Sequence, residues 1–122
     1  MQMQLNLHLI SHVQRLPAPK PWLDVCEVAR GIGFTTSVEI SLAFHDAIAS
    51  HPTEEDEAYD QRLYDALWLA HHFLSLDQRP AFSFPFDFLR EDKFSATHTE
   101  VSLRLSVEVN GKIVQLSLSP HG

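Results

Sequence analysis

The chain has 122 residues, of which 44% are hydrophobic and 20% charged, and its formal net charge is -7 with the histidines neutral. This composition is typical of a single globular domain, residues 1–122, that is long enough to bury a core. The acidic balance argues against direct binding to nucleic acid, which needs a basic surface.

Three further features favour a cytoplasmic protein that does not bind membranes. No apolar run reaches the ~18 residues of a membrane helix. The N-terminus, MQMQLNLHLI, lacks the basic start and long apolar core of a signal peptide, and a lone cysteine, Cys26, fits a reducing compartment. The acidic surface could face a basic partner, such as a nucleic-acid-binding protein whose substrate it imitates, but ordinary solubility is the simpler interpretation.

The N-terminal part of the chain predicts a strand, a linker and two short helices. Residues 2–10 alternate between apolar and polar side chains, as in a half-buried strand. Three prolines make residues 16–22 a stiff linker. Asp24 is expected to cap a helix from Val25 to Arg30, which a Gly-Ile-Gly stretch ends.

The next segment predicts extended structure followed by a second short helix. Residues 34–40 are β-branched and partly alternating, so extended structure is expected there. Ser41 is a candidate N-cap for a helix from Leu42 to Ala49.

Residues 53–76 predict one long central helix. Thr53 is a candidate N-cap, and neither glycine nor proline interrupts the stretch from Glu54 to Leu76. One stripe of this helix should face the core: Tyr59, Leu63, Ala66, Leu67, Ala70, Phe73 and Leu74. Polar residues are expected on the opposite side, among them Asp60, Gln61, Arg62 and Asp65.

The polar side also carries four aromatic or imidazole side chains, Tyr64, Trp68, His71 and His72, at helical spacing. The simpler interpretation is that another helix covers them. The alternative is a contact surface for a protein partner or for self-association, in which the histidines would add pH dependence near neutrality.

The C-terminal third predicts three strands. Alternating phenylalanines (Phe82, Phe84, Phe86 and Phe88) mark a strand with one aromatic face, and Pro85 places this strand at a sheet edge. Residues 89–97 are expected to be a polar loop. Residues 100–118 predict a hairpin with Asn110-Gly111 as a type I′ turn, which pairs Val107 with Val114 and Leu105 with Leu116.

The expected fold is therefore α+β, in the order β-α-α-α-β-β-β. About three helices should pack on one face of a four-stranded antiparallel sheet.

Two blocks of the sequence, LDVCEVARGIGF at 23–34 and RLYDALW at 62–68, resemble a family of small uncharacterised bacterial proteins from plasmids, phages and conjugative elements. The first block resembles the family pattern D-V-x-E-x-A-x-x-x-G-F and the second resembles R-L-[WY]-D-x-L-W. The chain departs from the pattern at Ser37, where proline is usual, at His45, where tryptophan is usual, and in a short last hairpin. The resemblance implies a mobile gene element or gene cassette, supplies no enzymatic activity, and includes Tyr64, Asp65 and Trp68 in the second block.

No catalytic or cofactor motif stands out, so an enzyme is not favoured and neither cofactor nor metal is expected. Within the predicted helices, no two histidines have the spacing that places two imidazoles on one helix face. A metal site would need distant residues to converge, for example His45, His72 and Asp65. Cys26 is expected to be a small buried residue, although a nucleophile is the alternative, and Glu54 with Glu55 should be a solvated helix start.

Two classes of function follow from these patterns. The favoured class is a non-enzymatic interaction protein, an adaptor or inhibitor that contacts its partner through Tyr64, Trp68, His71 and His72. The alternative class is a small-molecule-binding or catalytic domain with a deep pocket between sheet and helices, lined by Phe82, Phe84, Phe86 and Phe88.

Overall fold

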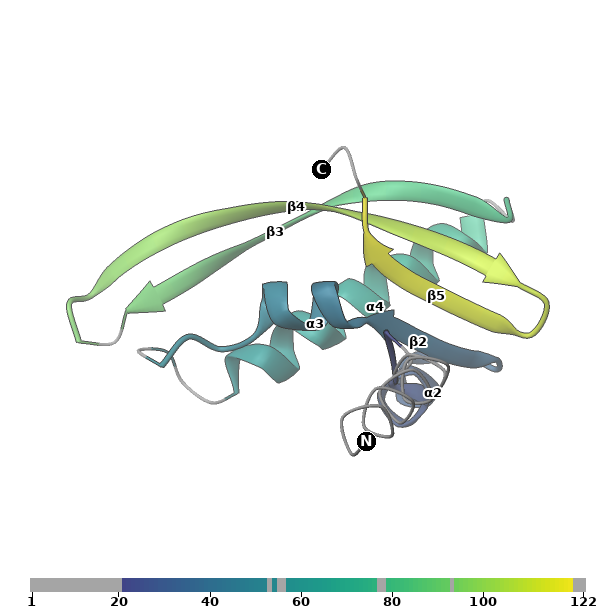
Figure 1. Ribbon diagram of the computed structural model, residues 1–122, viewed down its shortest axis with the longest axis horizontal. Coiled ribbons are helices and arrows are strands. Elements are labelled where there is room, and N and C mark those ends of the chain that lie inside the picture. The colour runs from purple at the N-terminus through teal and green to yellow at the C-terminus, as the bar shows by residue number, and fades with distance from the viewer. Residues whose placement is uncertain (1–20, 53, 55–56, 77–78, 93, 120–122) are drawn as a thin grey trace, which may run out of the picture.

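In the computed structural model, three helices lie beneath a five-stranded mixed sheet (Figure 1). The structure describes residues 21–52, 54, 57–76, 79–92 and 94–119. The predicted strand at 2–10, most of the predicted linker and the predicted cap Thr53 lie outside these residues. Within them the chain is α+β, as predicted.

The sheet differs from the expected four-stranded antiparallel one. Its strands are β1 (Trp22–Asp24), β2 (Ser37–Ser41), β3 (Ala81–Asp92), β4 (Thr97–Asn110) and β5 (Ile113–Leu118), in the order β1-β2-β5-β4-β3. Strand β2 pairs with β5 in parallel, and the other neighbours are antiparallel. Strand β2 is an inner strand because β1 and β5 pair with its two edges, and its side chains Val38 and Ile40 are buried. Residue 22, assigned to the linker by the sequence, belongs to β1.

The hairpin between β4 and β5 exists, but its predicted register is wrong by two residues. Val107 pairs with Leu116 and Leu105 with Leu118, so the two-residue loop is Gly111-Lys112. Gly111 has φ +62°, and Lys112 does not share a positive φ. A positive φ at the first loop position alone is the pattern of a type II′ turn, for which glycine is preferred there. The two-residue shift keeps every side chain on its predicted face.

The predicted loop at 89–97 is mostly strand. Strand β3 pairs with β4 along its whole length, from Ala81 opposite Glu108 to Asp92 opposite Thr97. The Asp92 carboxylate accepts hydrogen bonds from the backbone N–H groups of Phe94 and Ser95. Ala96 then adopts φ +57° and donates its N–H to the Asp92 carbonyl, which closes a tight turn. Polar side chains here mark exposed strand ends rather than a loop.

Strand β3 is an edge strand, as Pro85 predicted. Its outward backbone groups are partly covered, because the Leu89 carbonyl accepts from Arg62 and the Glu91 N–H donates to Glu54. Alternate residues of an antiparallel strand turn their backbone groups to the same edge. The ring nitrogen of Pro85 therefore points to the free edge, where the missing N–H breaks no ladder bond.

The first two helices are short and end at defined positions. Helix α2 spans Cys26–Ile32, so it starts one residue later and ends two residues later than predicted. Its N-cap is Val25 and not Asp24, although the Asp24 carboxylate accepts a hydrogen bond from the Cys26 N–H. Gly33 ends α2 with φ +133°. Helix α3 spans Leu42–Ile48, and Ser41 caps it by accepting from the Phe44 N–H, as predicted.

The central helix, α4, spans Ala58–Leu76 and so begins four residues after the predicted start at Glu54. Its core face is confirmed, since Leu63, Ala66, Leu67 and Ala70 are buried. These side chains meet buried strand residues from the sheet face above them: Val38, Ile40, Phe84, Phe86, Leu105, Val107, Val114 and Leu116. None of the helices described is both long and apolar enough to cross a membrane.

Candidate functional site

The outer side of α4 carries two large aromatic side chains that the described part of the chain leaves exposed. Tyr64 is 46% exposed and Trp68 is 48% exposed. The Trp68 ring stacks on the His72 imidazole, with centroids 5.3 Å apart and an angle of 8° between the planes. Within the described part of the chain no helix buries these two rings, so the interpretation that another helix covers the stripe does not hold there for Tyr64 and Trp68. We refer to Tyr64, Trp68 and His72 as the α4 outer face.

His71 does not join this face, although the sequence grouped it there. Its half-buried ring meets the Phe34 ring edge to face, with centroids 5.0 Å apart. The same imidazole lies over Gly33, where an added Cβ would be 3.1 Å from Nε2. His71 therefore contributes to the packing of α2 against α4.

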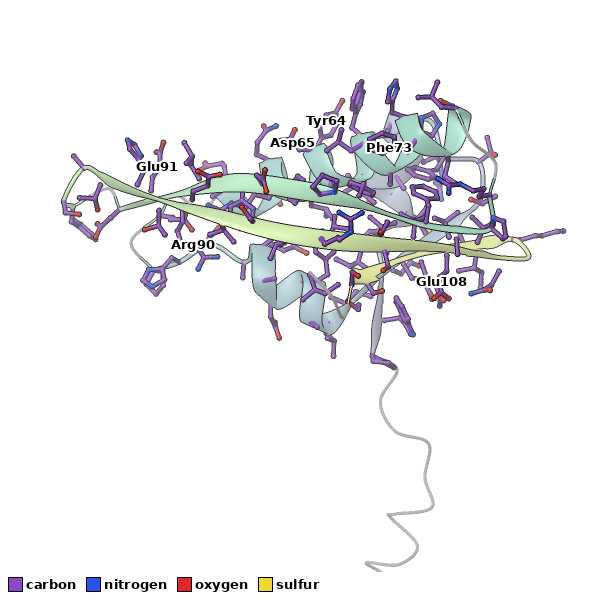
Figure 2. The ribbon with its side chains drawn as sticks, turned by 90° about the horizontal axis from the view of Figure 1, so that it is seen from above. Tyr64, Asp65, Phe73, Arg90, Glu91 and Glu108 are labelled. Carbon is purple, nitrogen blue, oxygen red and sulfur yellow. The ribbon has the colours of Figure 1, made fainter. Side chains whose placement is uncertain are left out.

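A groove of about 530 Å³ separates the α4 outer face from the edge strand β3. Its α4 side consists of Tyr64, Asp65, Trp68 and Leu69, and its β3 side of Pro85, Phe86 and Asp87. Figure 2 shows Tyr64 and Asp65 projecting from α4 on the side of the molecule where Glu91 of β3 also projects. Asp87 was not among the site residues predicted from the sequence. The alternation of the phenylalanine strand showed that Asp87 points away from the aromatic face, but it could not show that Asp87 lies close to α4.

A second hollow of about 490 Å³ continues the groove towards the start of α4. The two hollows share Asp65 and Asp87, and the second adds Glu57 and Glu91. Of these carboxylates, Glu91 lies 3.7 Å from an exposed histidine, His98. The whole groove is therefore aromatic at the Trp68 end and acidic along its length.

The floor of the second hollow holds a buried ion pair between Glu54 and Arg62. The Glu54 carboxylate accepts from both guanidinium Nη atoms and from the backbone N–H groups of His51 and Glu91. Arg62 also donates to the carbonyls of Ile48 and Leu89. The predictions of a solvated helix start at Glu54 and of an exposed polar position for Arg62 are therefore wrong. Both residues are only 4–5% exposed.

This environment determines the ionisation of Glu54. Burial alone would raise the pKa of the carboxyl group, but the hydrogen bonds from Arg62, His51 and Glu91 outweigh it and lower the pKa to about 2. The Arg62 guanidinium also lies 4.3 Å above the Phe88 ring centroid, which places a cation on an aromatic face. The pair therefore fixes the start of α4 against β3 and the end of α3.

The four alternating phenylalanines form part of the core more than they line a deep pocket. Phe84 and Phe86 are buried, and Phe82 and Phe84 pack against Phe73 of α4 with centroids 6.4 and 5.3 Å from its ring. Phe86 reaches the groove, and Phe88 lines the second hollow. The aromatic face predicted by period two is present, and the Phe73 ring of α4 packs against its Phe82 and Phe84 end.

The candidate catalytic groups are engaged in local contacts. The half-buried Cys26 sulfur lies 3.3 Å from the Val38 backbone nitrogen, which ties α2 to β2. His45 Nδ1 lies 2.6 Å from the Tyr59 hydroxyl, and burial raises the pKa of that phenol. His45, His72 and Asp65 do not converge, and no group of three or more potential metal ligands occurs among the residues described.

No family model matches the chain, and no solved structure matches it. A partial similarity exists to fungal enzymes described as probable beta-galactosidase C, from Neosartorya fischeri and from two strains of Aspergillus fumigatus. Each is 45% identical over 56 residues, which is 44% of this chain. The chain spans only 6% of the length of these curated relatives, so the similarity carries no argument about a reaction.

Proposed function

We propose that the protein is a non-enzymatic protein-interaction module, an adaptor or inhibitor encoded by a mobile gene element. Its contact surface is the α4 outer face together with the adjoining groove. The observation that carries the proposal is the exposure of Tyr64 and Trp68 on a helix whose opposite side already supplies the core. Tyrosine and tryptophan are frequent hot spots because they bury a large, rigid area at low entropic cost.

The similarity of residues 62–68 to the mobile-element family supports the same surface. In that block, Arg62, Leu63 and Leu67 have clear structural roles in the buried pair and the core. The exposed residues of the block, Tyr64, Asp65 and Trp68, have no such role within the described structure, yet they fit the pattern. A binding role for these three residues would explain why they fit the family pattern although folding does not require them.

Substitution of Trp68 tests the proposal. Trp68→Ala should weaken capture of the partner from bacterial host lysate by at least ~2 kcal/mol, the loss expected for a hot spot. Its melting temperature should stay close to that of the wild type, because the ring is not part of the core. Leu76→Ala is the matched control, since Leu76 is 70% exposed on the same helix but does not line the groove.

Two outcomes would contradict the proposal. One is a Trp68→Ala variant that captures the same proteins as Leu76→Ala. The other is a variant that unfolds, because Trp68 would then be a packing residue. Sedimentation of the wild type over a range of concentrations tells self-association apart from binding of a different protein.

A small-molecule ligand is the second candidate. The specific observation in its favour is the groove volume of about 530 Å³, which lies in the range of ligand pockets. A ligand of this kind would raise the melting temperature of the wild type but not of Trp68→Ala.

A further inference from the structure

Among the described residues, the lining of the groove beside Trp68 carries negative charge and no cation. Asp65 and Asp87 face it from α4 and β3, and its lining contains no arginine, lysine or histidine. The Asp65 carboxylate accepts a hydrogen bond from Gln61 Nε2 at 2.9 Å. Within the described part of the chain, neither aspartate forms an ion pair. Two unneutralised carboxylates next to two exposed aromatic rings favour a cationic ligand.

We infer that the groove takes an arginine side chain from an exposed segment of the partner protein. This inference rests on the proposed function, whose partner it defines chemically. A guanidinium group can lie on the face of Trp68 or Tyr64 and donate two parallel hydrogen bonds to a carboxylate. Lysine provides a point charge without this planar fork, so arginine fits the combination of rings and carboxylates better.

The second hollow offers further carboxylates to a longer segment of the partner. Glu57 and Glu91 add carboxylates beyond the shared pair, Asp65 and Asp87. The one arginine in its lining, Arg62, is already bound to Glu54. A segment with a further basic residue would therefore find a second acidic position next to the first.

A second copy of this chain is a poorer occupant of the groove. Two copies with a net charge of -7 would bring like charges together, and the acidic groove of each would face an acidic surface. Pro85 also removes an N–H from the free edge of β3 next to the groove, which hinders the pairing of this edge with another strand.

Peptide titration tests the inference. Trp22→Phe leaves Trp68 as the only tryptophan, so its fluorescence reports binding at the groove. The probes are short peptides in which glycine alternates with arginine, lysine or citrulline, the last being a neutral analogue of arginine. The arginine peptide should bind at least about tenfold more tightly than the citrulline peptide, and binding should weaken between about 0.1 M and about 1 M salt.

Charge-neutralising variants locate the site. Asp65→Asn and Asp87→Asn should each weaken binding of the arginine peptide by about threefold to tenfold. Glu108→Gln removes the same charge from an exposed residue far from Tyr64 and Asp65 (Figure 2) and should leave binding unchanged. A weakening by Glu108→Gln equal to that of Asp65→Asn would overturn the inference, because only the net charge would then matter.

The remaining outcomes separate this inference from the proposed function. Equal binding of the arginine and citrulline peptides, equally tight binding of the lysine peptide, or no binding of any of the three would overturn the arginine assignment. If Trp68→Ala still abolishes capture of the partner in that case, the interaction surface stands and only its ligand is wrong. If Trp68→Ala has no effect on capture, the proposed function itself fails.

Discussion

A buried carboxylate is tolerated only when charged and polar groups replace its lost hydration, and Glu54 meets this condition. Arg62 and two backbone N–H groups surround it, at positions as distant in the sequence as His51 and Glu91. Such a pair is costly to break from one side, by ~3–5 kcal/mol, because the remaining charge stays buried without a partner. The Glu54–Arg62 pair therefore acts as a structural clamp that holds α4 against β3 and the end of α3.

The lowered pKa of Glu54 predicts acid sensitivity. The carboxyl group has an ordinary pKa of 4.5 when unfolded and about 2 when folded, so its stabilisation is fully present above pH 4.5. As the pH falls from 4.5 to about 2, the free energy of unfolding should decrease by about 3 kcal/mol. Urea unfolding at a series of pH values measures this decrease.

Two variants control the acid-sensitivity experiment. Glu57→Gln changes an exposed carboxylate nearby and should keep the slope of the wild type. Glu54→Gln removes the titrating group and should flatten the slope over the same pH range. Parallel pH profiles for Glu54→Gln and the wild type would show that Glu54 is not the source of the acid sensitivity.

At the scale of elements, the contact between α2 and α4 depends on one glycine. Gly33 ends α2 with φ +133°, and the His71 ring of α4 lies where its side chain would begin. Phe34 follows at once and packs against the same imidazole. The Gly-Phe pair of the first sequence block thus explains how α2 is placed against α4.

Alanine substitution should change the free energy of unfolding in opposite directions at Gly31, inside α2, and at Gly33, which follows it. Gly33→Ala should destabilise the protein by about 1–2 kcal/mol, because alanine avoids positive φ and its Cβ would press on His71. Gly31 lies inside α2 with open space around it and without a positive φ, so Gly31→Ala should stabilise by ~0.5–1 kcal/mol. Urea midpoints of both variants test this contrast. A Gly33→Ala variant as stable as Gly31→Ala would contradict it.

For the whole molecule, the features predicted correctly are those with a local cause. The Ser41 cap, the core stripe of α4 and the edge position of β3 all follow from side chains a few residues apart. The parallel pairing of Ser37 with Ile113 and the bond between Arg62 and Leu89 join distant segments, so no local pattern could indicate them.

The candidate site also combines features with a local cause and features that depend on tertiary structure. Helical spacing brought Tyr64, Trp68 and His72 together correctly, but it could not show that His71 turns towards Phe34. The acidic wall contributed by Asp87 depends on how β3 approaches α4, which is a tertiary property.

The covered outer edge of β3 has a consequence for aggregation. A long edge strand rich in phenylalanine is a ready template for amyloid-like association through its unpaired backbone groups. Here Arg62 and Glu54 occupy two of those groups, and Pro85 removes a third. We therefore expect the Glu54–Arg62 pair and Pro85 to hinder aggregation through this edge.

Pro85→Thr should therefore raise light scattering on prolonged incubation at high protein concentration, because it restores an N–H at the edge. Ser83→Thr is the matched control, since it adds the same side chain at a neighbouring edge position that already has its N–H. Equal light scattering by the two variants would contradict the prediction, because the added threonine and not the restored N–H would then cause the association. A difference confined to Pro85→Thr would make the missing N–H at position 85 a determinant of how long the protein stays in solution at high concentration.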